Sequence, residues 1–152
     1  MGATLQVRGL TKTFGDATAV NDVSLDIAPG QFVSLLGPSG CGKTTTLRIV
    51  AGLERADSGR IVIDGRDISH VPPQRRKIGM VFQQYALFPN LTASENIAFA
   101  LRVAREPNAA VAARVNDLLE LVHLEDAADR YPHQLSGGMQ QRVALARALA
   151  IE

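Results

Sequence analysis

The feature that most constrains the fold is a glycine-rich run between an apolar stretch and a helix-like stretch. It fills every fixed position of the pattern G-x-x-x-x-G-K-[ST] and consists of Gly37, Pro38, Ser39, Gly40, Cys41, Gly42, Lys43 and Thr44. Residues 32–36 before it form an apolar run that predicts a short buried strand, and residues 45–51 after it carry apolar side chains at helical spacing, namely Leu47, Val50 and Ala51. A strand, a glycine-rich turn and a helix in this order predict a loop that wraps a chain of phosphates.

The residue types in this run suit the binding of an anion. Glycines allow positive φ angles, so successive N–H groups can converge on a phosphate. A helix that begins near Lys43 adds its free first-turn N–H groups. We expect Lys43 to reach the β and γ oxygens and Thr44 to offer its hydroxyl to Mg²⁺. The alternative, a glycine-rich turn that binds nothing, is disfavoured because the glycine spacing, the Lys-Thr pair and the strand-to-helix context agree.

Length and composition indicate one soluble domain. With 152 residues, of which 46% are apolar and 20% charged, the chain can bury a real core. A net charge of +1 gives no reason to expect a nucleic-acid partner, and the apolar runs are too short for a membrane span. Residues 1–9 lack the design of a signal peptide, and a single cysteine, Cys41, cannot form an internal disulfide. We therefore expect a reducing, cytosolic compartment.

The first part of the chain is rich in predicted strands. Residues 5–8 and 23–27 alternate apolar and polar side chains, which predicts an antiparallel flank. Residues 60–64 form a further predicted strand that is closed by the turn signal Asp64-Gly65, and residues 78–82 form another apolar run.

The pattern becomes helical beyond Pro89. Thr92 or Ser94 can cap a helix that runs through Leu101. A second helix is predicted from an apolar stripe, which we interpret as core: Val111, Val115, Leu118, Leu119 and Val122.

A second glycine-containing run separates this chain from other phosphate-loop proteins. Residues 135–142 read LSGGMQQR and precede a helix-like run, so that Ser136 stands at the N-cap position and Gly137 and Gly138 expose first-turn N–H groups. The run therefore predicts a second anion site.

These motifs resemble those of the ATP-binding subunits of ABC transporters, whose signature reads L-S-G-G-Q; Met139 takes the fifth place here. The resemblance spans nearly all of the chain. It implies that Phe14 lies against adenine, that residues 37–44 are the Walker A loop, and that Gln83 is the Q-loop glutamine. Residues 72–77 and 85–89 look most like the importer branch, which takes up polyamines, ferric iron, sulfate, phosphonates or sugars.

The resemblance implies an α/β fold: an incomplete P-loop NTPase core of the ABC ATPase kind, with an antiparallel β flank and a helical subdomain. Residues 1–88 would be the β-rich core and residues 89–150 the helical part of one nucleotide-binding domain. The implied cofactors are ATP and Mg²⁺. Thr44 and Gln83 would serve the metal, and Gln83 would also serve catalysis. The implied cofactor-binding residues are Phe14, Gly37, Pro38, Ser39, Gly40, Cys41, Gly42, Lys43, Thr44 and Thr45, with Ser136, Gly137, Gly138 and Gln140 acting in trans.

The resemblance also implies partners and a location. Two subunits would pair head to tail with ATP between residues 37–44 of one and residues 136–140 of the other. Transmembrane permease subunits would dock near residues 85–89, a solute-binding protein would act indirectly, and no nucleic acid is involved. The subunit would be peripheral, at the cytoplasmic face of the inner membrane.

Plainer interpretations stay open for single residues. Phe14 can be a core or loop aromatic, and Gln83 can be a strand-end amide. Tyr85, Leu87 and Phe88 can be core residues rather than an exposed docking patch. Cys41 can be a reactive thiol or a bystander in the loop. The histidines have no metal-ligand spacing and are most simply surface or capping residues: His70, His123 and His133.

In the family, a Walker B strand, a D-loop and a switch histidine follow the signature helix. Glu152 ends a helical pattern, so it does not match the catalytic glutamate. We expect these 152 residues to bind nucleotide and to hydrolyse it far more slowly than an intact family member. The main alternative is a binding or assembly fragment without turnover. A second is an ABC ATPase of repair or translation, whereas residues 135–140 exclude a P-loop kinase. Open apolar edges at residues 33–36 or 78–82 further predict self-association.

Overall fold

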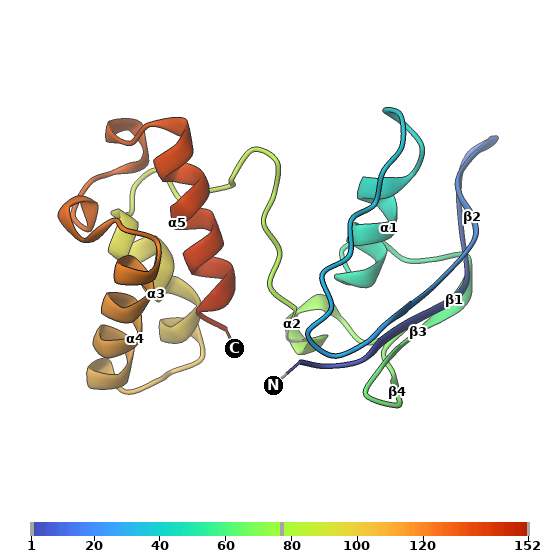
Figure 1. The fold of residues 1–152 in the computed structure, drawn as a ribbon, viewed down its shortest axis with the longest axis horizontal. Helices are drawn as coiled ribbons and strands as arrows, with labels where there is room; N and C mark the ends of the chain where they lie inside the picture. The colour runs from blue at the N-terminus through green and yellow to red at the C-terminus, as the bar shows by residue number, and fades with distance from the viewer. Residues whose placement is uncertain (1, 77, 152) are drawn as a thin grey trace. The chain divides into compact units, whose positions relative to one another are not determined.

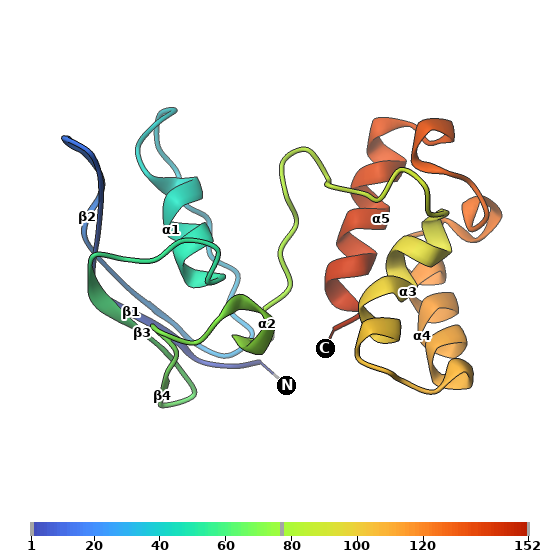
Figure 2. The same cartoon turned by 180° about the vertical axis from the view of Figure 1, so that it is seen from behind.

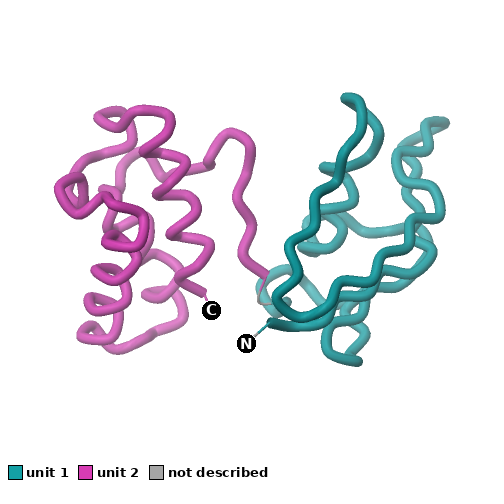
Figure 3. The backbone as a smooth tube through the Cα atoms, in the orientation of Figure 1, with its two compact units in different colours: residues 1–77 teal, residues 78–152 magenta. Residues whose placement is uncertain are grey.

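The computed structural model describes residues 2–76 and 78–151. These belong to two compact units, residues 1–77 and residues 78–152 (Figure 3). The first contains a sheet and two helices, and the second is helical (Figure 1). The assignment of residues 1–88 and 89–150 to functional parts of one domain stays a prediction, because compactness divides the chain by contacts and not by role.

The first unit is built on an antiparallel sheet with the strand order β2-β1-β3-β4. The strands are β1 (Leu5–Phe14), β2 (Ala17–Ile27), β3 (Ser58–Ile63) and β4 (Arg66–Asp67). Val7 pairs with Leu25 on one side and with Ile61 on the other, and Val7 and Ile61 are buried. The predicted antiparallel flank is therefore confirmed.

The predicted turn at Asp64 and Gly65 joins β3 to β4. Both residues have left-handed backbones, with φ of 48° and 77°, and Ile63 pairs with Arg66 across the turn. Two consecutive left-handed residues are what a two-residue hairpin turn requires, so the Asp-Gly signal was a reliable predictor.

Helix α1 (Lys43–Val50) follows the glycine-rich run as predicted; of the three apolar residues at helical spacing, Ala51 is buried and Val50 partly buried, but Leu47 is not. Thr46 and Ile49 are buried, whereas Leu47 is 52% exposed. The Thr46 hydroxyl donates to the backbone oxygen of Gly42 at 3.0 Å. This bond satisfies the Thr46 hydroxyl, so a threonine can be buried on the inner face of α1. Leu47 lies about 100° further round the helix and is therefore exposed. A short helix, α2 (Pro73–Arg76), closes the unit.

The second unit packs three helices around one core (Figure 2). They are α3 (Ala93–Val103), α4 (Asn108–Leu121) and α5 (Gly137–Leu149), with short 3₁₀ turns at Glu125–Ala127 and Pro132–Gln134. Thr92 caps α3 in a reciprocal capping box with Glu95, which decides between Thr92 and Ser94. The stripe predicted as core on α4 is buried: Val111, Val115, Leu118, Leu119 and Val122.

Two predicted strands are wrong for this structure. Residues 32–36 and 78–82 have no regular secondary structure. Phe32 is 93% exposed and Leu36 90%, and Phe82 is 39% exposed. A buried parallel strand needs hydrogen-bonded neighbours and covering helices. Within residues 2–76 and 78–151, no strand forms a ladder with either segment, so their backbones stay irregular.

Candidate phosphate-binding site

The glycine-rich loop closes around the ammonium group of Lys43. Lys43 Nζ donates to the backbone oxygens of Gly37 and Pro38, each at 2.7 Å, and to Cys41 Sγ at 3.4 Å. Lysine has three N–H donors on its ammonium, and the loop offers three acceptors. The loop therefore holds a fixed positive charge at its centre, and the contact of Lys43 with phosphate oxygens stays a prediction.

The N-terminus of α1 adds donors beside this charge. Gly42 is the N-cap residue with φ of 89°, so no side chain accepts from the first-turn N–H groups, and that turn contains no acidic residue. Uncapped N–H groups and the positive end of the helix dipole favour an anion there. The loop and the N-terminus of α1 together therefore suit the binding of an anion.

Gly42 also fixes the loop against the sheet. A Cβ atom at this position would overlap the backbone oxygen of Ala19 in β2, and the left-handed backbone would strain any other residue. Gly40 has a similar φ of 84° but open space around it. The two glycines therefore have different roles. Gly40 allows the turn, whereas Gly42 allows both the turn and the close approach of two backbone segments.

The remaining loop side chains face solvent. Pro38, Ser39, Cys41 and Thr44 are exposed, and Thr45 is partly buried. An exposed hydroxyl at Thr44, on the first turn of α1, fits a role as one ligand of Mg²⁺ beside phosphate oxygens, since Mg²⁺ in such sites takes few protein ligands. No cluster of three or more His, Cys, Asp or Glu able to hold a metal occurs among residues 2–76 and 78–151.

Phe14 lies at the end of β1 and is 48% exposed. Lys12 Nζ lies 5.0 Å from the centroid of its ring, and Lys12 pairs with Glu54 and Asp57. The ring is therefore neither a core residue nor free of partners. A half-exposed aromatic supported by a cation suits stacking on a flat, electron-poor ring.

The second predicted anion site starts α5. The hydroxyl of Ser136 accepts from the backbone N–H of Met139 at 3.3 Å, which confirms the predicted N-cap. Gly137 and Gly138 are exposed. Met139 packs against the helical core, which explains how an apolar residue occupies this place. Gln140 Nε2 donates to the backbone oxygens of Pro132 at 2.9 Å and Leu135 at 3.2 Å, so its amide supports the turn before the helix.

Gln83 is exposed and lies in an irregular segment of the second unit. The phosphate loop lies in the first unit, and the signature residues lie with Gln83 in the second. The structure thus brings together residues 37–43, and the roles of Gln83, Ser136 and Gln140 towards a nucleotide stay predictions.

The exposed docking patch predicted near Gln83 is present only in part. Leu87 packs against the helical core, Tyr85 is partly buried and Phe88 is 38% exposed. Leu87 therefore belongs to the core, as the alternative interpretation had it.

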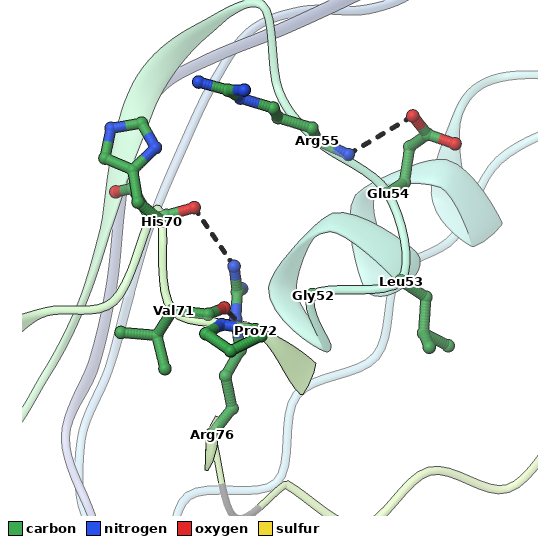
Figure 4. Close-up of a pocket in the computed structure, with 9 residues that line it drawn as sticks. Gly52, Leu53, Glu54, Arg55, His70, Val71, Pro72 and Arg76 are labelled. Atoms are coloured by element: carbon green, nitrogen blue, oxygen red, sulfur yellow. Dashed lines mark hydrogen bonds between the residues drawn. The ribbon is translucent and has the colours of Figure 1, made fainter. Parts of the chain in front are cut away.

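Sequence reasoning missed Arg76, which is 9% exposed. Its guanidinium donates to four backbone oxygens: those of Val71 at 2.7 Å, Ile49 at 2.8 Å, Val50 at 2.7 Å and Ser69 at 3.1 Å. It forms one wall of a pocket of about 420 Å³ (Figure 4). Burial lowers the pKa of Arg76. Because backbone oxygens accept from all three of its side-chain nitrogens, Arg76 is a structural residue. An arginine between Arg75 and Lys77 gives no sequence signal of burial.

Asn96 and Arg147 were missed as well. Asn96 is fully buried, and Arg147 on α5 reaches the segment that follows Gln83.

None of the helices in residues 2–76 and 78–151 combines the length and apolarity needed to cross a membrane.

Comparison with known proteins identifies similar chains. Residues 20–152 match a family described as ABC transporter. The spermidine/putrescine import ATP-binding protein of Chromobacterium violaceum is 55% identical over 97% of this chain and 41% of its own length. The sulfate/thiosulfate import ATP-binding protein of Burkholderia mallei is 56% identical over 100% of this chain and 44% of its own length. The chain thus spans less than half of these curated relatives.

Solved structures give the same result for the fold. A dimeric ATP-binding cassette in a post-hydrolysis state with ADP and Pi is 38% identical, with a TM-score of 0.86 over 96% of this chain and 69% of that one. A dimeric bacterial ABC transporter cassette is also 38% identical, with a TM-score of 0.87. The P-loop fold expected from the sequence is confirmed.

Proposed function

The chain belongs to the ABC transporter family, and we propose that it forms the nucleotide-binding part of an ATP-binding subunit of an importer. Residues 37–44 would hold the phosphates of ATP. The match to residues 20–152, together with import ATP-binding proteins at 55% and 56% identity, supports the proposal.

The observation that carries the proposal is the position of the Lys43 ammonium group inside the loop. Its bonds to the backbone oxygens of Gly37 and Pro38 hold a positive charge beside the uncapped start of α1. A triphosphate offers several negative oxygens at this place, and charge-assisted bonds to them outweigh bonds to neutral carbonyls. Lys43 would therefore exchange loop oxygens for the β and γ oxygens.

Thr44 and Gln83 are the proposed protein ligands of Mg²⁺, with Gln83 acting directly or through water. The metal, when bound, neutralises charge that develops on the phosphates. Phe14 would stack on the adenine, and the loop would position the γ phosphate and stabilise its charge. In the whole subunit, these contributions would serve ATP hydrolysis coupled to uptake.

The same proposal assigns partners. The solved neighbours are dimers by their descriptions, which supports the pairing of two subunits. The pair would be head to tail, with the start of α5, at Ser136, Gly137 and Gly138, facing the nucleotide of the other subunit. Membrane partners would dock near residues 85–89, at the cytoplasmic face of the inner membrane. Relatives of nearly equal identity carry different solutes in their names, so identity does not select the solute.

Calorimetric titration with ATP and Mg²⁺ tests the proposal. Lys43→Ala should weaken nucleotide binding by on the order of 1.5–3 kcal/mol, or abolish it at measurable concentrations. Arg48→Ala is the matched control, since Arg48 is an exposed cation on the same helix and should bind like the parent. Equal affinity of the Lys43→Ala variant and the parent chain would overturn the assignment of the loop.

A further inference from the structure

The segment that follows Gln83 has a costly backbone conformation. Tyr85 and Ala86 are consecutive non-glycine residues with left-handed φ angles of 58° and 46°. Each such residue costs about 1–2 kcal/mol. The turn is closed by the Tyr85 N–H, which donates to Phe82 at 2.9 Å, and by the Ala86 N–H, which donates to Gln84 at 2.6 Å. Such a conformation persists only where neighbouring groups hold it.

Arg147 supplies those groups. Its Nη1 donates to the backbone oxygen of Ala86 at 2.8 Å, and its Nη2 donates to that of Tyr85 at 3.0 Å. Its guanidinium carbon also lies 5.7 Å from the ring centroid of Phe88. Both strained residues thus present their carbonyl groups to one rigid, charged fork, which suits bidentate donation.

The downstream half of the segment is held from a different helix. Asn96 on α3 accepts from the Phe88 N–H at 2.9 Å and donates to the oxygens of Phe88 at 3.2 Å and Leu91 at 3.0 Å. The rings of Phe88 and Phe99 lie 4.5 Å apart. Arg147 therefore holds the strained residues Tyr85 and Ala86 to α5, whereas Asn96 holds the residues after them to α3.

Helix α5 carries Arg147 near its end and Ser136 at its start. Ser136 and Arg147 are eleven positions apart (147 − 136), which is about 16 Å of rigid helix at 1.5 Å per residue. A shift of the anion-facing end therefore moves the arginine that holds Tyr85 and Ala86.

We propose that Arg147 is a positioning residue that holds the turn at Tyr85 and Ala86, so that α5 links its own anion-facing start to residues 83–88, which overlap the proposed docking segment, residues 85–89. The link to docking rests on the proposed function, whereas the holding of the turn does not. The structure offers a matched control on the same helix: Arg142 Nη1 donates to the backbone oxygens of Val122 at 2.8 Å and His123 at 3.2 Å, away from the docking segment.

Amide hydrogen exchange followed by mass spectrometry tests the positioning. In Arg147→Met, peptides that cover residues 83–88 should exchange about tenfold faster, while the α5 peptides keep their protection. Arg142→Met should leave residues 83–88 unchanged. Arg147→Lys keeps the positive charge but loses the bidentate guanidinium, so the exchange rate of residues 83–88 should lie between those of the parent and Arg147→Met. This variant also tests the proposal if Arg147→Met does not fold. Unchanged exchange at residues 83–88 in both Arg147 variants overturns the proposal.

The link to docking is tested in the full-length subunit assembled with its membrane partners. Arg147→Lys should lower the ratio of partner-stimulated to basal ATP turnover by threefold or more while nucleotide affinity stays at the parental value; Arg142→Lys should change neither. A parental ratio in Arg147→Lys overturns the link. Equal ATP binding by Lys43→Ala and the parent would instead overturn the proposed function, and the exchange result would stand.

Discussion

Nη1 of Arg76 donates to the backbone oxygen of Ile49 at 2.8 Å, at the carboxyl end of the helix that begins in the phosphate loop. The same nitrogen reaches the oxygen of Val50 at 2.7 Å. The last carbonyls of a helix lack partners of their own, and a buried cation both satisfies them and complements the negative end of the helix dipole. Arg76 therefore stabilises the element that presents Lys43.

Replacing Arg76 should cost much of the stability of the first unit. Arg76→Met removes four hydrogen bonds to backbone oxygens, of which that of Ile49 keeps the Gly52 N–H as a donor, so we expect a loss of about 3 kcal/mol or more in the free energy of unfolding. Urea denaturation followed by circular dichroism measures the effect. Arg75→Met, on the exposed neighbour in α2, should stay within about 0.5 kcal/mol of the parent. Similar losses in both variants would contradict the structural role of Arg76.

Substitutions at Gly40 and Gly42 separate the two structural requirements of the loop, a left-handed backbone and a close approach to β2. Gly42→Ala adds left-handed strain and an overlap with the oxygen of Ala19, so it should destabilise the unit by about 2–5 kcal/mol. Gly40→Ala adds strain alone, at about 1–2 kcal/mol. Urea denaturation compares the two. Equal losses would show that β2 gives way easily and that the close approach at Gly42 does not constrain the loop.

The parts that were predictable from the sequence are those with short-range causes. The Asp64-Gly65 turn, the cap at Ser136 and the Thr92–Glu95 capping box depend on residues that are neighbours in the chain. The phosphate loop is predictable for the same reason, because its donors and its lysine all lie within residues 37–44.

The parts that were not predictable depend on distant backbone acceptors. Arg76 and Arg147 have the sequence appearance of solvated cations, and carbonyl oxygens that are 27 and 61 residues away leave no trace in the pattern. The strands predicted at residues 32–36 and 78–82 were wrong for a different reason. Their apolar pattern is real, but a strand forms only when a neighbouring strand completes its ladder.

The acid sensitivity of the first unit should depend in part on Asp57. The N–H of Thr13, and then the Lys12 ammonium, lower the pKa of Asp57 below its ordinary value. A carboxyl whose folded pKa is lowered contributes stability above the unfolded pKa, near 4, and loses it as the pH falls through the folded value. Asp57→Asn should therefore show a smaller drop in Tm between pH 6 and pH 3 than the parent.

Thermal unfolding at several pH values measures this difference. Asp16→Asn, in the exposed turn between β1 and β2, is the control and should follow the parental curve. A parental drop in Tm for Asp57→Asn would mean that its contacts with Thr13 and Lys12 contribute no pH-dependent stability.

Two substitutions at Ser136 should separate its structural role from its proposed role towards a nucleotide. Ser136→Ala removes the bond to the Met139 N–H and should cost about 1 kcal/mol of stability. Ser136→Asp caps a helix as well as serine does and adds a charge that the helix dipole favours, so its Tm should match or exceed that of the parent. The same charge opposes a phosphate across the proposed dimer, so ATP-dependent dimerisation of the full-length subunit should weaken by about tenfold or more. Sedimentation with and without ATP measures this. Parental dimerisation in Ser136→Asp would restrict Ser136 to capping α5.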